Sequence, residues 1–230
     1  RDAAGIDLSS TVHFFFMRSA GAFLKSRRFS DFASLFRIPE LEMWLRAFLR
    51  GNNEHELASA DFPRLLDEYQ SRHLQSDIIG GVFGADSESA KVRVLHAGIV
   101  YLLGELSGQS RSLRDWMPLL RDTVVRLFDG LDEVRGLQAE LQIRACEAIR
   151  VLLQEIFELP LSGAITVDVG QMLSIVVELL RAQKLPPESR EEALNILGWL
   201  ELQLDDAPVL VVSAFNEGRV PESVNADPFL

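Results

Sequence analysis

Apolar residues recur at helical spacing along most of the chain, with polar residues between them. This spacing places the apolar side chains on one face of a helix, where they can be buried. The pattern predicts helices over residues 8–25, 29–36, 39–51, 61–73, 89–106 and 131–159, and a further helix that ends near residue 183. The sequence therefore predicts a mainly α protein.

Local signals mark the ends of several of these helices. Ser9 or Ser10 is placed to cap the first helix, because a hydroxyl there can accept from a free amide group. Ser112 and Asp115 have the spacing of a capping box. Pro118 follows soon after and lacks an amide hydrogen, so we expect a kink or a late start in that helix.

The pattern changes towards the end of the chain. Residues 165–167 form a short β-branched run, and Asp168 is placed to cap the next helix. Beyond Pro186 and Pro187, the apolar runs 193–197 and 208–215 are typical of buried parallel strands. We expect two regions, a helical one over residues 1–160 and a small α/β one over residues 161–230.

Composition limits the choice of partners. Hydrophobic residues make up 47% of the chain, and the formal net charge is −11, so the surface as a whole does not attract phosphate or anionic lipid. The single Cys146 excludes an internal disulfide and fits a reducing compartment. No stretch has the length of a membrane span, so we expect a soluble, cytoplasmic protein with no membrane partner.

The chemistry-bearing residues show no catalytic or metal-binding motif. His13, His55, His73 and His96 are separate from one another and from Cys146 along the chain, so each is interpreted as structural. The chain has no phosphate-binding P-loop motif, and Ser213 does not lie in a nucleophile elbow. We expect no cofactor and no metal in these residues.

A cluster of arginines surrounds Trp116. Arg111, Arg114, Arg121 and Arg126 lie within SRSLRDWMPLLRDTVVR and form a basic island that can meet a phosphate backbone, with Trp116 against a base. The alternative is that these arginines pair with neighbouring acidic residues on an exposed helix.

The end of the chain resembles a known family. Residues 193–230, ALNILGWLELQLDDAPVLVVSAFNEGRVPESVNADPFL, are similar to the C-terminal helicase region of AddB-like subunits of bacterial helicase-nuclease complexes, relatives of UvrD-like superfamily 1 helicases. Upstream, FSDFASLFRIPELEMWL and SLRDWMPLL resemble the helical insertion of that family more loosely. The positions that match the family's C-terminal pattern are Leu200, Glu201, Asn216, Glu217, Gly218, Pro221 and residues 227–230.

The chain also departs from the active members of this family. They carry Lys-Gly-Leu-Glu between two strands, with Thr and His upstream, whereas this chain has Gly198, Trp199, Leu200 and Glu201. The resemblance is therefore to the degenerate form of the motif, which leaves ATP hydrolysis by this module unsupported.

The resemblance implies a partial RecA-like parallel sheet after the helical insertion. The loop 216–219 would then follow the second strand, where open α/β sheets place their functional loops. The other reading of this loop is a turn with no ligand, made by Gly218 and by Asn216 bonding its own backbone. The candidate DNA or interdomain contacts are Gly198, Glu201, Asn216, Glu217, Gly218 and Arg219, together with Arg111, Arg114 and Trp116.

The expected function follows from the resemblance. The chain would be a non-catalytic fragment of a helicase-nuclease protein of DNA double-strand break repair, with a PD-(D/E)XK nuclease downstream in the parent protein. It would shape a DNA channel through local contacts and pack on a partner subunit. The alternative is a helical protein-interaction module with no nucleic-acid role, and an enzyme complete within these residues is a third reading.

Overall fold

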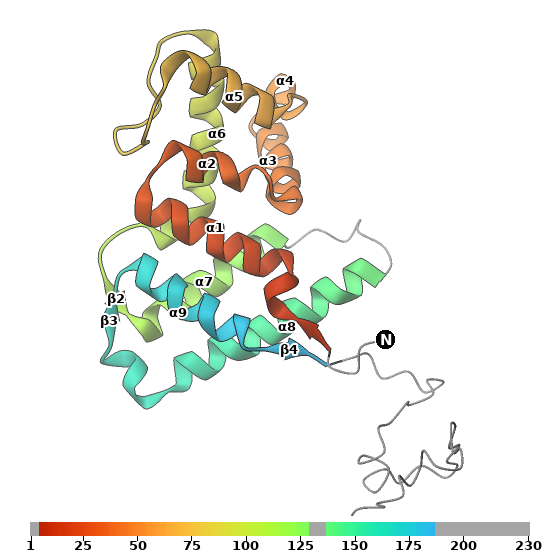
Figure 1. The fold of residues 1–230 in the computed structure, drawn as a ribbon, viewed down its shortest axis with the longest axis vertical. Helices are drawn as coiled ribbons and strands as arrows, with labels where there is room; N and C mark the ends of the chain where they lie inside the picture. Colours follow the sequence, from red (N-terminus) through yellow and green to blue (C-terminus); the bar gives the residue numbers. More distant parts are fainter. Residues whose placement is uncertain (1–4, 129–136, 187–230) are drawn as a thin grey trace, which may run out of the picture. The chain divides into compact units, whose positions relative to one another are not determined.

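In the computed structural model, which describes residues 5–128 and 137–186, most of the chain is helical (Figure 1). The α-helices are α1 (Val12–Ser26), α2 (Phe29–Leu35), α3 (Pro39–Gly51), α4 (His55–Ala58), α5 (Phe62–His73), α6 (Ser87–Leu103), α7 (Leu113–Phe128), α8 (Leu137–Glu158) and α9 (Val169–Arg181). Within the described residues, the 3-10 segments are η1 (Leu8–Ser10), η2 (Gly104–Leu106) and η4 (Pro160–Gly163). The prediction of a mainly α protein is confirmed for the described residues.

The described part of the chain also has two-residue strands, namely β1 (Ile6–Asp7), β2 (Arg111–Ser112), β3 (Thr166–Val167) and β4 (Lys184–Leu185). They form two antiparallel pairs, in which Ile6 lies opposite Leu185 and Arg111 lies opposite Val167. The described strands therefore contain no parallel pairing. The two strands predicted over 193–197 and 208–215 lie outside the described residues.

The chain divides into two compact units, Arg1–Pro187 and Glu188–Leu230. Residues 161–186, which the sequence analysis places with the C-terminal region, belong to the first unit. The reason is tertiary packing: α9 lies along α1, and β4 pairs with β1 at the start of the chain (Figure 1). A strand pair of this kind joins residues almost at the two ends of the unit.

Several local predictions are confirmed. Asp168 caps α9 through a capping box with Gln171, in which the Asp168 carboxylate accepts from the Gln171 amide at 2.8 Å. Ser112 Oγ accepts from the Asp115 amide at 3.1 Å, which is one half of the predicted capping box; the Asp115 carboxylate accepts from the Ser112 hydroxyl at 2.6 Å, whereas a full capping box uses the Ser112 amide. The β-branched run ahead of Asp168 forms β3.

One local prediction is wrong, and one of the two alternatives given for another is excluded. The first long helix is preceded by Thr11 and not by Ser9 or Ser10. Thr11 makes no side-chain cap, and its hydroxyl donates to the Leu8 carbonyl at 2.7 Å. The helix α7 begins at Leu113, so Pro118 does not delay its start. Pro118 lies in the second turn, where its ring removes a single amide hydrogen bond.

The core of the first unit is rich in aromatic rings. Phe23, Phe29, Phe32 and Phe36 are buried and pack in edge or tilted contacts, with ring centroids 5.1 to 5.9 Å apart. Such contacts add to the stability that burial of the rings provides. The run TVHFFFM is part of this core, apart from Phe15, which is 40% exposed.

Candidate protein-interaction surface

Arg114, one of the candidate contact residues, holds the chain where α8 ends. Its Nε donates to the Phe157 carbonyl at 3.1 Å and to Ser162 Oγ at 3.3 Å, and its Nη2 donates to the Leu159 carbonyl at 3.3 Å. The carbonyls at a helix end have no partner within the helix, so a guanidinium that bonds them fixes the turn that follows. Ser162 is itself buried, and its hydroxyl donates to the Leu159 carbonyl at 2.7 Å.

Trp116 fixes the same stretch of chain further along. It is fully buried, and its indole Nε1 donates to the Val167 carbonyl at 3.0 Å. The Leu113 amide donates to the Ile165 carbonyl at 2.8 Å beside the β2–β3 pair. Because the Trp116 ring is enclosed, it does not present a face to a base, and its role here is structural.

Arg111 completes the set of candidate residues on α7 and β2. Its side chain is exposed, and its guanidinium carbon lies 5.2 Å from the centroid of the Trp116 ring. The structure thus brings Arg111, Arg114 and Trp116 together around the segment 157–167.

The segment that these residues hold displays apolar side chains to solvent. We call residues 157–165 the apolar segment. Its exposed fractions are 40% for Phe157, 54% for Leu159, 70% for Leu161 and 44% for Ile165. Exposed apolar residues are common on their own, but four within nine positions on a backbone held by hydrogen bonds are typical of a contact surface.

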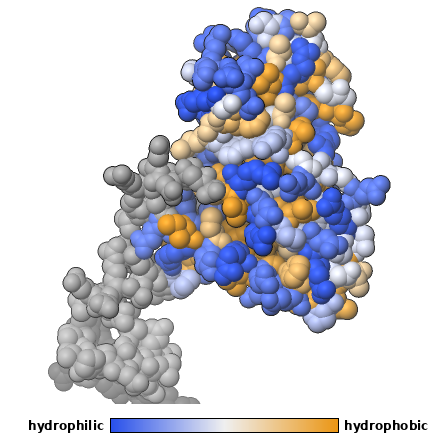
Figure 2. All heavy atoms as spheres, turned by 180° about the vertical axis from the view of Figure 1, so that it is seen from behind, coloured by the Kyte–Doolittle hydropathy of each residue, from blue (hydrophilic) through white to orange (hydrophobic). Residues whose placement is uncertain are grey.

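Apolar side chains are exposed elsewhere as well, among them Leu74 (77%), Ile79 (77%) and Phe83 (55%). Figure 2, which shows the opposite side from Figure 1, has hydrophobic areas interspersed with hydrophilic ones. Ile143, in the first half of α8, is 69% exposed and offers a counterpart to Leu161 outside the apolar segment.

The other arginines of the basic island are paired with acids. Arg121 contacts Asp122 at 2.8 Å, and Arg126 contacts Glu105 at 3.1 Å while its guanidinium carbon lies 5.8 Å from the Tyr101 ring centroid. For these two residues, the interpretation as surface ion pairs is confirmed. Gly198, Glu201, Asn216, Glu217, Gly218 and Arg219 lie outside the described residues.

A second polar cluster joins His73, Asp86 and Ser89, the residue types of a hydrolase triad. In such a triad, the carboxylate and the hydroxyl bond opposite nitrogens of the imidazole ring. Here both contact the same one, with Asp86 Oδ2 at 3.0 Å and Ser89 Oγ at 3.2 Å from His73 Nε2. Asp86 caps α6, and the hydrogen bonds from the Ser89 amide and hydroxyl hold the pKa of its carboxyl well below the usual range. The arrangement is therefore a helix cap.

His13 and Cys146, far apart along the chain, meet in the fold. His13 Nε2 lies 2.9 Å from Cys146 Sγ, which has the spacing of a nucleophile and its base. Burial lowers the pKa of His13 to about 4 and raises the pKa of Cys146 to about 11. Both groups are thus neutral near pH 7, and a thiolate, which nucleophilic attack requires, is disfavoured.

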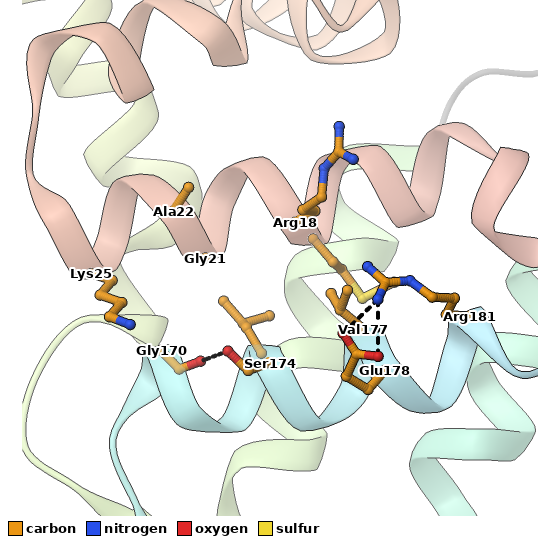
Figure 3. Close-up of a pocket in the computed structure, with 11 residues that line it drawn as sticks. Arg18, Gly21, Ala22, Lys25, Gly170, Ser174, Val177, Glu178 and Arg181 are labelled. Carbon is orange, nitrogen blue, oxygen red and sulfur yellow. Dashed lines mark hydrogen bonds and ion pairs between the residues drawn. The ribbon is translucent and has the colours of Figure 1, made fainter.

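A shallow groove of about 250 Å³ follows the packed helices α1 and α9 (Figure 3). The helices approach closely because Gly21 has no side chain; a Cβ there would lie 3.3 Å from the Leu173 side chain. Arg181 at the rim is paired with Glu178 at 2.8 Å, and the Ser174 hydroxyl donates to the Gly170 carbonyl at 2.8 Å. The polar groups of the groove thus bond mainly to one another, and its shape follows from helix packing.

Sequence reasoning missed the apolar segment. The stretch FELPLSGAI has the pattern of the end of a helix followed by a turn. Its apolar residues are spaced in a way that predicts buried side chains. A signal was available in Pro160 and Gly163, which place these residues in a turn, where chain is normally at the surface.

The fold and this surface define a class, namely a mainly helical protein with an apolar surface segment held in place by an arginine and a tryptophan. Among the described residues, no helix is both long and apolar enough to cross a membrane, and no three His, Cys, Asp or Glu side chains are grouped to hold a metal ion. Comparison of the chain with protein-family models, curated proteins and solved structures gives no match.

Proposed function

We propose that the helical unit binds another protein through the apolar segment. The observation that supports this proposal is the combination of four exposed apolar side chains with a backbone that Arg114 and Trp116 hold in one conformation. A surface that is already ordered loses less conformational entropy when it binds.

The exposed area of the apolar segment limits the binding free energy that this segment contributes. Full burial of one large apolar side chain contributes roughly 1.5–3 kcal/mol, so covering the exposed parts of these four contributes about 4 kcal/mol. Association costs at least that much in translational and rotational freedom. The segment is thus proposed as the centre of a larger interface and not as the whole of it.

We further propose that the partner is the second subunit of a helicase-nuclease complex of DNA double-strand break repair. This part rests on the resemblance of residues 193–230, including a partial RecA-like parallel sheet with the loop 216–219 at its carboxyl edge. In this proposal the chain is a non-catalytic, cytoplasmic part of a larger protein, and its DNA contacts are local. Arg111 supplies one of them, because its guanidinium is exposed.

The alternative function is a helical interaction module with no nucleic-acid role. The buried ring of Trp116, the hydrogen bonds of Arg114 and the net charge of −11 favour it, because each reduces the attraction for a phosphate backbone. Both functions use the same apolar segment and differ in the partner.

Photo-crosslinking in the producing cell tests the interaction. A photoreactive amino acid at Leu161 is compared with one at Ile143, since the two native side chains are 70% and 69% exposed. We expect a discrete adduct from position 161 and none from position 143. The adduct from position 161 is expected to be lost when the same chain also carries Phe157→Lys. Equal adduct patterns from both positions would contradict the proposal.

The identity of the adduct separates the two functions. A helicase or nuclease subunit supports the helicase-nuclease proposal, and any other discrete protein supports the interaction module. Binding of the 230-residue chain to single-stranded DNA is measured alongside over a salt series. Affinity that rises as salt is lowered supports local DNA contacts, and no binding at low salt removes them.

A further inference from the structure

A second cavity, separate from the apolar segment, lies where the start of α1, the link between α2 and α3, and the first half of α8 meet. Its volume is about 360 Å³, which is room for about ten water-sized groups. Its apolar walls are formed by Val12, Phe15, Ile38, Pro39, Leu141 and Ala145. A cavity of this size and lining suits a small molecule with an apolar body.

Glu40, in the first turn of α3, brings an unpaired acceptor to this cavity. Its Oε1 accepts from Gln142 Nε2 at 3.1 Å, whereas its Oε2 is buried and has no hydrogen-bond partner among the described residues. A buried carboxylate oxygen without a donor is costly. A ligand with a protonated amine would supply that donor after a small rotation of the side chain.

His13, which also lines the cavity, has an unpaired ring nitrogen. The residue is fully buried, and its Nδ1 has no hydrogen-bond partner among the described residues. The other ring nitrogen lies 2.9 Å from Cys146 Sγ, and burial keeps the thiol protonated, with its pKa raised to about 11. In the neutral imidazole, Nδ1 carries the proton when the thiol donates to Nε2, and it is an acceptor when Nε2 donates to the sulfur.

Arg37 provides a cation at the mouth of the cavity. Its side chain is exposed and makes no ion pair with any residue that the structure describes. A guanidinium is the preferred partner of a carboxylate, since its donors match the two oxygens.

We propose that this cavity binds a small zwitterion of the amino-acid class with an apolar side chain. The ammonium group bonds Glu40, the carboxylate bonds Arg37, and the side chain lies against the apolar walls. The ligand then supplies a donor to Glu40 Oε2, which has none among the described residues. This site is independent of the proposed protein interaction.

Titration calorimetry on the full chain tests the proposal with three probes. Leucine carries both charges, isopentylamine carries only the amine, and 4-methylpentanoate carries only the carboxylate. We expect leucine to bind at least about tenfold more tightly than either of the others, since each lost charge pair costs about 1.4 kcal/mol or more. No measurable heat with any of the three at millimolar concentration overturns the proposal.

Two variants assign the charges. Glu40→Gln keeps an acceptor for Gln142. It is expected to weaken the binding of leucine and of isopentylamine by about tenfold or more. The matched control Glu54→Gln, at an exposed glutamate, is expected to leave both unchanged. Arg37→Gln, at an exposed position, is expected to weaken the binding of leucine but not the binding of isopentylamine. Unchanged leucine affinity in Arg37→Gln and Glu40→Gln overturns the proposal.

Discussion

Replacing Arg114 by methionine tests whether this arginine fixes the apolar segment or serves a nucleic acid. Methionine keeps an apolar side chain of similar length but removes the guanidinium, whose carbon lies 5.8 Å from the centroid of the Phe157 ring. That group donates hydrogen bonds to the Phe157 carbonyl, the Leu159 carbonyl and Ser162 Oγ at 3.1 to 3.3 Å. We expect the substitution to destabilise the fold without preventing it.

The expected loss follows from these three bonds. A hydrogen bond contributes about 0.5–1.5 kcal/mol net, and the lower half of this range applies where water can replace the lost donor, as at exposed carbonyls. The free energy of unfolding should therefore fall by about 2 kcal/mol in Arg114→Met. It is measured by urea denaturation, with the slope checked so that the midpoints are comparable.

The same variant should change local dynamics. Amide hydrogen exchange of residues 157–167 is expected to accelerate more than that of α1 or α6, because the turn loses its anchor. The matched control is Arg121→Met, which removes an exposed ion pair with Asp122 and should cost less than about 0.5 kcal/mol. If Arg114→Met is as stable as Arg121→Met but binds single-stranded DNA less tightly, the structural role assigned to Arg114 is refuted.

Three further predictions concern other parts of the unit. Gly84→Ala should destabilise the fold by about 2 kcal/mol, because φ is +89° and a Cβ would lie 2.2 Å from Ser89 Oγ. Burial lowers the pKa of His13 from 6.5 to about 4, so the unfolded state binds more protons between these values. Stability should be full above pH 6.5 and fall by up to about 3 kcal/mol towards pH 4. Burial raises the pKa of Cys146 from 9.0 to about 11, so its reaction with a disulfide reagent at pH 8 should be about 100-fold slower than that of a free cysteine.

Each of the three has its own control. Gly80→Ala, where a Cβ meets no atom within 4 Å and φ is not positive, should be close to neutral in the same urea titration. His13→Leu should flatten the dependence of stability on pH, whereas a change at the exposed His55 should retain it; a flat profile in the unmodified chain would contradict the cause given for His13. Rapid modification of Cys146 in the folded protein, at the rate seen in urea, would show that burial does not protect the thiol.

The helices could be predicted because their information is local. Apolar spacing, the Pro39 start with the Gly51 end, and the Asp168 cap all act within a few residues, and each corresponds to an observed helix boundary. The predictions that failed also concerned local interactions. Thr11 donates its hydroxyl backwards to Leu8 and does not cap α1. Pro118 lies within α7, which begins at Leu113, so the late start that we expected does not occur.

The roles of the polar side chains could not be predicted in this way. In the sequence, Arg114 and Trp116 are a cationic residue close to an aromatic one. This pattern occurs both where a protein contacts a nucleic-acid base and where side chains stabilise a hydrophobic core. The fold decides between these roles, because it places residues 157–167 against α7 and so supplies the carbonyls that both side chains bond.

Contacts between distant parts of the chain were decided by tertiary structure alone. His13 and Cys146 are 133 positions apart, and β1 pairs with β4 across almost the whole unit. A helix pattern specifies which face is buried but not which helix covers it, since any apolar face of similar shape can do so. The periodicity of this chain therefore determined its helices, whereas the packing of α8 and α9 on α1 and α7 determined which side chains meet and which remain exposed.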